Sequence, residues 1–273
     1  SGRSADGVGR AVTSDSGCAF IAIGEAKLEY RLIGPSPEEA PTIVLLHEGL
    51  GSVSSWRDFP ARLQEATGMG VLSYSRPGYG RSSSTPLPRP ADYLHREALE
   101  VLPRALDAVG VREAVLFGHS DGASIATIYA GAKNDPRVRA LALLAPHFMV
   151  EPVSIAGIEE ARIAYEQHGL RGRLARHHAH VDVAFYGWND TWLREDFAAL
   201  DLRAFVRNIS APVFMAQGED DRYGTLAQLD VLNEHCRAPV ESLILAGCGH
   251  APHREKADEL LGGFTSFLDR RLG

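Results

Sequence analysis

The chain has 273 residues, of which 45% are hydrophobic and 23% are charged, as is typical of a soluble globular protein. A chain of this length forms one or two domains and can bury a core without disulfides or a structural metal. The formal net charge of −7 lacks the basic excess that neutralises phosphates, so we expect no nucleic-acid partner. No stretch approaches 18 consecutive apolar residues, so we expect no membrane span.

Residues 1–17 are polar and contain no apolar run of the length that a signal peptide needs. We therefore predict a flexible N-terminal tail at residues 1–17. The chain has three cysteines, Cys18, Cys236 and Cys248. A small, odd number of cysteines does not indicate a disulfide framework. This cysteine usage predicts a cytoplasmic protein.

From residue 20 onward, apolar runs of strand length alternate with amphipathic runs of helix length. The expected strands cover residues 20–23, 27–33, 42–47, 70–75, 114–117, 140–144, 213–216 and 243–245. The expected helices cover residues 55–66, 91–109, 122–132, 225–235 and 256–272. This alternation predicts an α/β fold with a mostly parallel central sheet of about eight strands, covered by helices.

The section between the sixth and seventh expected strands has a different character. Residues 147–208 contain no strand-like apolar run; they are helical in pattern, polar, and carry several aromatic side chains. We predict that this section is a helical cap inserted after the sixth strand. The core then consists of residues 18–146 and 209–273.

Residues 118–122 read Gly-His-Ser-Asp-Gly, a G-x-S-x-G pattern between an expected strand and an expected helix. A nucleophile elbow has this setting, because its serine occupies a strained turn and the flanking glycines let strand and helix approach closely. We therefore predict that Ser120 is a catalytic nucleophile. The alternative is a glycine-rich turn in which Ser120 only caps the helix.

A serine hydroxyl needs a base to take its proton, and the base needs an acid to orient it. Residues 217–221 (QGEDD) and 247–250 (GCGH) follow the last two expected strands, in the order acid then histidine. We predict His250 as the base, with His253 as the alternative. Asp220 and Asp221 are both candidates for the acid, and we favour Asp221.

Five segments together resemble the α/β-hydrolase superfamily over about residues 20–270. They are LLHEGLG (45–51), YSRPGYGRS (74–82), FGHSDGAS (117–124), QGEDD (217–221) and GCGH (247–250). The resemblance implies the α/β-hydrolase fold and a triad of Ser120, His250 and Asp221. Asp221 has this role because it lies three residues after Gly218, as in the G-x-x-D segment of such proteins.

The resemblance also implies an oxyanion hole formed by the backbone amides of Asp121 and of Gly49, with Leu50 as the alternative to Gly49. The sequence reads His47-Glu48-Gly49 where the superfamily has His-Gly, so Glu48 brings a carboxylate close to the oxyanion. We favour side chains of Glu48 and Asp121 that face away and fix loops, since an uncompensated negative charge there raises the barrier. The alternative is that one of them contacts a cationic or hydroxylated substrate.

The substrate pocket is expected to include Glu48, and His147, Trp188 and Trp192 from the insert and its border. Residues 171–180 are rich in arginine and histidine, but the histidines would face different sides of a helix. We therefore expect a solvated cap helix there, no metal site, and no cofactor.

These assignments predict a serine hydrolase that cleaves a small carboxylic ester through an acyl-enzyme. Because one fold supports several reactions, a C–C bond, a lactone or an amide is the alternative target. A non-catalytic, hydrolase-like binding or receptor protein is the alternative from a different class.

Overall fold

The computed structural model describes residues 12–13 and 18–273. These residues form one nine-stranded sheet, with the strand order β1-β2-β3-β5-β4-β6-β7-β8-β9. The strands are β1 (Val12–Thr13), β2 (Ala19–Ile23), β3 (Ala26–Ile33), β4 (Thr42–Leu46), β5 (Gly70–Tyr74), β6 (Ala114–His119), β7 (Val138–Leu144), β8 (Val213–Gly218) and β9 (Val240–Leu245). The eight predicted strands are all present. The predicted tail lies outside the described residues, except for β1.

The sheet is mostly parallel, as predicted. Strands β5, β4, β6, β7, β8 and β9 pair in parallel in that order. The first three strands pair antiparallel with one another, and β3 pairs antiparallel with β5. The buried strands β4, β5, β6 and β8 have every residue buried, which explains their continuous apolar runs.

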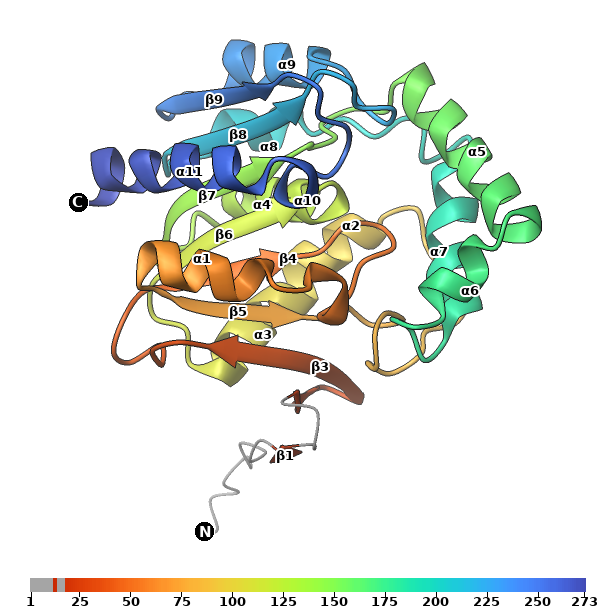
Figure 1. Cartoon of the computed structure of the whole chain (residues 1–273), viewed down its shortest axis with the longest axis horizontal. Helices are drawn as coiled ribbons and strands as arrows, with labels where there is room; N and C mark the ends of the chain where they lie inside the picture. The colour runs from red at the N-terminus through yellow and green to blue at the C-terminus, as the bar shows by residue number, and fades with distance from the viewer. Residues whose placement is uncertain (1–11, 14–17) are drawn as a thin grey trace, which may run out of the picture.

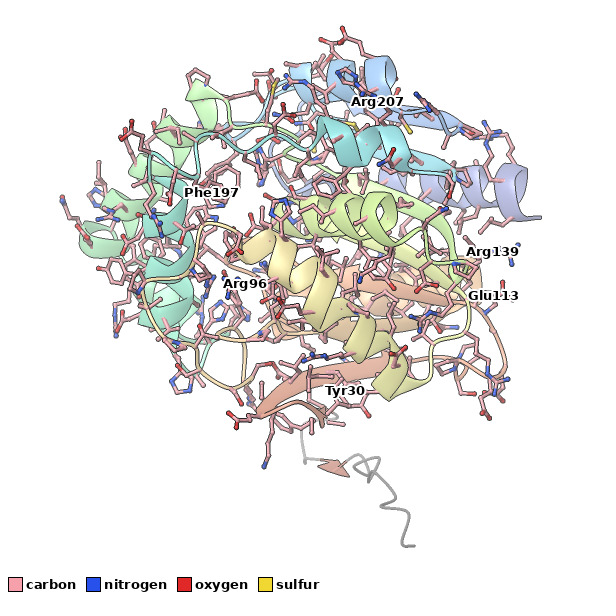
Figure 2. All side chains as sticks on the ribbon, turned by 180° about the vertical axis from the view of Figure 1, so that it is seen from behind. Tyr30, Arg96, Glu113, Arg139, Phe197 and Arg207 are labelled. Carbon is pink, nitrogen blue, oxygen red and sulfur yellow. The ribbon has the colours of Figure 1, made fainter. Side chains whose placement is uncertain are left out.

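Helices cover both faces of the sheet. They are η1 (Ser54–Trp56), α1 (Phe59–Thr67), α2 (Tyr93–Arg96), η2 (Glu97–Val101), α3 (Leu102–Val109), α4 (Asp121–Lys133), α5 (Pro152–Gln167), α6 (Leu170–Leu174), α7 (Val181–Trp192), α8 (Arg203–Asn208), α9 (Ala227–His235), α10 (Pro252–Glu255) and α11 (Ala257–Leu272). Figure 1 shows α1 and α11 on the near face, and Figure 2, seen from behind, shows α3, α4 and α8 on the other.

The alternation of side chains along each strand divides the core into two layers. On β4, Ile43 and Leu45 pack with residues of α1 and α11. Val44 and Leu46, which point to the opposite face, pack with residues of α3, α4, α8 and α9. Each face of the sheet therefore has its own buried cluster, and the site must lie at an edge of the sheet.

The single helix predicted for residues 91–109 is three consecutive segments, because η2 is a stretch of π-helix between α2 and α3. The change in hydrogen bonding comes just before Pro103. Proline has no N–H to donate to the carbonyl four residues earlier, so a regular α-helix cannot continue through this position.

Helices α5, α6 and α7 lie together beyond the arrowheads of the parallel strands (Figure 1). Helix α8, by contrast, packs against α4 on the back face, where a Cβ at Gly131 would lie 2.2 Å from the carbonyl oxygen of Phe205. The predicted insert thus supplies three helices at the carboxyl edge of the sheet and a fourth on its face. The domain limits 18–146, 147–208 and 209–273 stay a prediction.

Candidate active site

Ser120 sits in a sharp turn between β6 and α4. Its backbone has φ 53° and ψ −115°, a conformation that is costly for a residue with a side chain. The turn requires its glycines: a Cβ at Gly118 would lie 2.3 Å from the carbonyl oxygen of Gly122, and a Cβ at Gly122 would lie 1.9 Å from that of Leu46. The motif therefore has the strained strand–turn–helix geometry expected from its sequence.

The turn is held by backbone hydrogen bonds on both sides of the serine. The N–H of Ser120 donates to the carbonyl of Leu144 at the end of β7, at 2.9 Å. The carbonyl of Ser120 accepts from the amides of Ala123 and Ser124 in the first turn of α4. The amide of Asp121 lies at the start of this helix, where N–H groups have no partner within the helix and are available to an anion.

His250 and Asp221 are brought together from loops that follow β9 and β8. Nδ1 of His250 lies 2.9 Å and 2.8 Å from the two carboxylate oxygens of Asp221. The Asp221 side chain is 1% exposed, whereas that of His250 is 19% exposed. Asp220 is exposed, so the structure places only Asp221 against the imidazole.

The carboxylate of Asp221 is also held by its own loop. It accepts hydrogen bonds from the amide of Tyr223 and from Nε2 of Gln217, both at 2.8 Å. Burial raises the pKa of Asp221, but the hydrogen bond and charge of His250 and the Tyr223 amide outweigh this and leave the pKa below its usual value. Asp221 is thus an ionised, oriented acceptor for the Nδ1–H of the imidazole.

Ser120 and His250 line the same cavity. Within the part of the chain that the structure describes, no hydrogen bond joins the Ser120 hydroxyl to the His250 imidazole. Contacts of this kind are often long in an enzyme without substrate and tighten when the substrate binds.

The loop after β4 presents Gly49 to the cavity. The preceding carbonyl, that of Glu48, accepts three hydrogen bonds, from Nη2 of Arg76 (2.9 Å), from Nδ1 of His47 (2.7 Å) and from the amide of Gly51 (3.1 Å). A trans peptide points its N–H opposite to its C=O, so these bonds orient the Gly49 N–H away from Arg76. Gly49 is required, because a Cβ there would lie 2.2 Å from Nε1 of Trp188.

The side chain of Glu48 lines the cavity and is 23% exposed. Its carboxylate lies 3.7 Å from Nδ1 of His119. Burial raises the pKa of Glu48, but the imidazoles of His119, His47 and His253 hold it well below its usual range. Nε2 of His119 in turn contacts the carbonyl of His250 at 2.6 Å. Glu48 therefore borders the cavity as a carboxylate with a neighbouring imidazole.

The side chain of Asp121 points away from the cavity and is completely buried. It accepts a 2.5 Å hydrogen bond from the hydroxyl of Tyr93 and lies 3.6 Å from Nη1 of Arg76. The indole N–H of Trp192 donates to the same Tyr93 hydroxyl at 3.0 Å. The side chain of Asp121 thus anchors the start of α4 on the side that faces away from the cavity.

The cavity has a volume of about 290 Å³. Most of the residues that the sequence assigned to the site and its pocket line this cavity: Ser120, His250, Glu48, Gly49, His147, Trp188 and Trp192. Asp221 and Asp121 are not among the lining residues. Leu50, Ile158, Leu170 and Leu174 supply most of its apolar wall. Tyr223 also lines it, with its ring centroid 4.7 Å from that of His250.

His147 lies between helix α7 and His250. Its ring packs edge-on against Trp192 at 5.0 Å and lies 5.8 Å from the ring of His250. Burial, together with the charge of His250, lowers the pKa of His147 to about 3. His147 is therefore a neutral wall of the cavity at ordinary pH.

His253, the alternative base, does not line this cavity. It is buried, with its ring 4.8 Å from Trp56 and 5.5 Å from Phe59. Cys248 is also buried, and burial raises the pKa of its thiol to about 11, so it has no thiolate at neutral pH. Both side chains are packed in the interior and do not line the cavity.

The expectation of a solvated helix at residues 171–180 is wrong in part. Helix α6 ends at Leu174, and His178 is buried in the turn that follows. Its Nδ1 accepts the amide N–H of Gly80 at 3.0 Å, and its Nε2 lies 2.8 Å from the carbonyl of Leu50. His178 therefore connects the segment after α6 with the loops that follow β4 and β5. Among the residues described, no group of three His, Cys, Asp or Glu side chains could hold a metal.

From the sequence, no functional role was assigned to Arg76, which lies in the segment 74–82. The available signal was a charged residue two positions after the end of a fully buried strand, because a charge at such a position needs buried partners. The arginines around the cavity opening were also missed, since they come from segments far apart in the chain.

Comparison with known proteins shows what family this architecture represents. The sequence profile of the alpha/beta hydrolase family matches residues 43–262, which is most of the chain. The chain belongs to the alpha/beta hydrolase family. The match includes the serine turn and both loops that supply His250 and Asp221.

The curated relatives match shorter stretches. The chain is 32% identical over 113 residues to proline iminopeptidase PfmaB of Pestalotiopsis fici, covering 41% of this chain and 38% of that protein. It is 31% identical over 84 residues to zearalenone hydrolase of Cladophialophora bantiana, covering 31% of each. The matched stretches thus span about a third of the length of these relatives.

Among solved structures, a hydrolase from Pseudomonas aeruginosa PA01 is similar with a TM-score of 0.71 and 24% identity, over 93% of this chain and 99% of that one. This likeness shows a shared fold. No helix in the described part of the chain is both long enough and apolar enough to cross a membrane.

Proposed function

We propose that the chain is a serine hydrolase that cleaves a small carboxylic ester, with Ser120 as nucleophile, His250 as base and Asp221 as the acid that orients it. The observation that carries the proposal is the pairing of His250 with the buried Asp221, at the edge of the cavity that Ser120 also lines. Membership of the alpha/beta hydrolase family and the hydrolase names of both curated relatives favour an enzyme over a binding or receptor protein.

The reaction begins when the Ser120 oxygen attacks the ester carbonyl while Nε2 of His250 takes the hydroxyl proton. Asp221 accepts the Nδ1–H and stabilises the imidazolium that forms. The tetrahedral oxyanion is held by the amides of Gly49 and Asp121. His250 then gives its proton to the leaving alcohol, and a water activated by His250 releases the acyl group from Ser120 as an acid.

The orientation of the Gly49 amide supports this assignment of the oxyanion hole. Three donors fix the carbonyl of Glu48, so the Gly49 N–H is preorganised before substrate arrives. Fixed donors need no reorganisation during the reaction, and one of them contributes roughly 10²–10³-fold to the rate of a typical acyl transfer. Leu50, the alternative donor, lies one residue beyond the peptide that is held in this way.

The decisive experiment compares wild type with Ser120→Ala on p-nitrophenyl butyrate, together with labelling by a fluorophosphonate probe. We expect wild type to turn over the ester and to be labelled at Ser120, and Ser120→Ala to show neither. Ser210→Ala, in the loop before β8, is the control and keeps both. Retention of most activity in Ser120→Ala contradicts the proposal.

The scissile bond is tested with a panel of substrates on the same protein. An ester, a lactone, a β-diketone and a prolyl anilide represent the candidate bonds, and the anilide is included because one curated relative is a proline iminopeptidase. We expect the ester to have the highest kcat/KM. A higher value for another member of the panel replaces the ester with that bond while leaving the triad in place.

A further inference from the structure

Four exposed arginines line the candidate active-site cavity: Arg57, Arg173, Arg176 and Arg254. We call them the mouth arginines. They come from three separate parts of the chain, namely the residue after η1, helix α6 with the turn behind it, and helix α10. The whole chain has a net charge of −7, so these arginines form a local excess of positive charge.

The mouth arginines have no carboxylate partner among the described residues, whereas many other arginines do. Arg171, on the same helix as Arg173, donates two hydrogen bonds of 2.9 Å and 2.8 Å to Asp182 and does not line the cavity. Of the described lining residues, Glu48 is the one carboxylate, and it lies beside His119. Among the described residues, no ion pair therefore neutralises the mouth arginines. Three acidic residues share a separate hollow with Arg254: Glu255, Asp258 and Glu259.

The electrostatic environment of His177 is a second indication that these charges lie near one another. Its Nδ1 lies 2.8 Å from the hydroxyl of Ser54, and its side chain lines the cavity. Burial lowers the pKa of His177, and the positive charges of Arg176, Arg57 and Arg254 lower it further, against the smaller opposite effect of Glu48. Three of the four mouth arginines therefore create a shared positive potential at this imidazole.

The inner wall of the cavity is different in character. It consists mostly of aliphatic and aromatic side chains, and the reacting groups lie on it. A second hollow of about 470 Å³ shares Arg57, Arg176 and His177 with the first, and Arg31, Arg81 and the carboxylate-bearing Glu29 also line it. A ligand that fits the whole site has an apolar part near Ser120 and a negative part at the opening.

We propose that the substrate carries an anionic oxygen group, a carboxylate or a phosphate, remote from the scissile bond, and that the mouth arginines bind it. The inference rests on the proposed function, because it names the substrate class of the same site. Arginine presents a planar fork of donors that matches both anions. A cluster of like charge at the mouth of a cleft also raises the local concentration of an oppositely charged substrate.

The test uses matched esters with one leaving group. 4-Nitrophenyl pentanoate is neutral, 4-nitrophenyl hemiglutarate ends in a carboxylate, and the same chain ending in a phosphate monoester separates the two anions. Butyrate esters of 4-hydroxybenzoate and of its methyl ester place the charge on the leaving group instead. We expect at least one anionic ester to exceed its neutral counterpart about tenfold in kcat/KM, because each exposed arginine contributes only modestly.

The ratio of kcat/KM for the anionic ester to kcat/KM for its neutral counterpart is then measured in the double variant Arg173→Gln/Arg176→Gln and in added NaCl. We expect the ratio to fall at least fivefold in the double variant, and to fall in 0.5 M NaCl because salt screens exposed charges. Arg207→Gln, on α8 at the back of the molecule (Figure 2), removes a positive charge far from the cavity and is expected to leave the ratio unchanged. Comparing variants cancels the intrinsic reactivity of each ester.

Failure of this inference can be told apart from failure of the proposed function. Calorimetric binding of the hemiglutarate and pentanoate esters to Ser120→Ala gives the same comparison without turnover. Tighter binding of the anionic ester that is lost in the Arg173→Gln/Arg176→Gln background supports the inference, even if no ester is cleaved. Equal kcat/KM and equal binding for anionic and neutral esters, on both sides of the scissile bond, overturn it.

Discussion

Nη2 of Arg76 donates a 2.9 Å hydrogen bond to the carbonyl oxygen of Glu48. The same guanidinium lies 3.6 Å from the carboxylate of Asp121, and both side chains are almost fully buried. Arg76 thus connects the Glu48–Gly49 peptide with the side chain of Asp121, and the amides of Gly49 and Asp121 are the two proposed to form the oxyanion hole. Arg76 is not among the described residues that line the cavity, so we assign it a positioning role.

Arg76→Lys is expected to lower kcat by about 10–100-fold while KM changes less than threefold. A lysine keeps the charge but cannot reach the Glu48 carbonyl and Asp121 together, so the donor that binds the transition state loses its fixed orientation. Steady-state kinetics separate the two constants. Arg89→Lys is the control, since Arg89 also lies 4.7 Å from the Tyr79 ring but does not contact Glu48. Equal losses in both variants would argue for a general packing defect.

Gly122→Ala is expected to prevent formation of the native turn. Its Cβ would lie 1.9 Å from the carbonyl oxygen of Leu46, and neither backbone can move without breaking the strand pairing around it. We expect little folded protein, measured as soluble yield and Tm. Gly262→Ala in α11 is the matched control, because a Cβ there meets nothing within 4 Å and alanine favours a helix interior by about 1 kcal/mol. A stable, active Gly122→Ala protein would show that the turn has another geometry.

Acid is expected to destabilise the fold below about pH 6.5. Burial lowers the pKa of several histidines, among them the buried His47, His147, His178 and His253. In the unfolded chain they take protons near the usual histidine pKa, whereas in the folded state they stay neutral. The stability they contribute is complete above that pH and is lost as the pH falls. Each proton taken up on unfolding contributes a slope of about 1.4 kcal/mol per pH unit.

Urea denaturation at pH 7.5, 6.5 and 5.5 measures this slope. His253→Phe keeps an aromatic ring between Trp56 and Phe59 but cannot be protonated. We expect the free energy of unfolding of this variant to change less steeply with pH than that of wild type, by the contribution of about one proton. A slope identical to that of wild type would mean that His253 is not kept neutral by the fold.

Glu97→Gln is expected to stabilise the protein at pH 8 more than at pH 5. Burial raises the pKa of Glu97 to about 7, against the attraction of Arg76 and Arg89. Between its unfolded and folded pKa values the folded state holds a proton that the unfolded state has lost, so stability falls as the pH rises through this range. Since one pKa unit corresponds to about 1.4 kcal/mol, the difference between variant and wild type is on the order of 3 kcal/mol across this window. Thermal melts of both proteins at the two pH values test it, and a constant difference rejects it.

Glu48→Gln is expected to change kcat/KM by the same factor for neutral and for amine-bearing esters. The carboxylate has a neighbour in His119, and a Cβ at Gly51 would lie 2.2 Å from it, so it is enclosed by its own loop. We therefore expect it to shape the loop and not to bind the substrate. A loss more than threefold greater for the amine-bearing ester would assign Glu48 to substrate recognition.

The local sequence determined the order of strands and helices, because continuous apolar runs and amphipathic runs differ in periodicity whatever surrounds them. It also determined the serine turn, since Gly118 and Gly122 occupy positions where any Cβ would collide with backbone. The order of Ser120, Asp221 and His250 along the chain predicted a common site, because the carboxyl ends of parallel strands meet at one edge of the sheet.

Tertiary structure alone decided between neighbours of the same residue type. Asp221 and Asp220 are adjacent carboxylates, and only the path of the loop places one against His250 and exposes the other. His253, three residues after His250, is packed under the site for the same reason. The mouth arginines depend on tertiary structure over the longest range. Nothing in the sequence near Arg57 indicates that Arg254 will lie at the same cavity, because distances in space are not encoded by spacing along the chain.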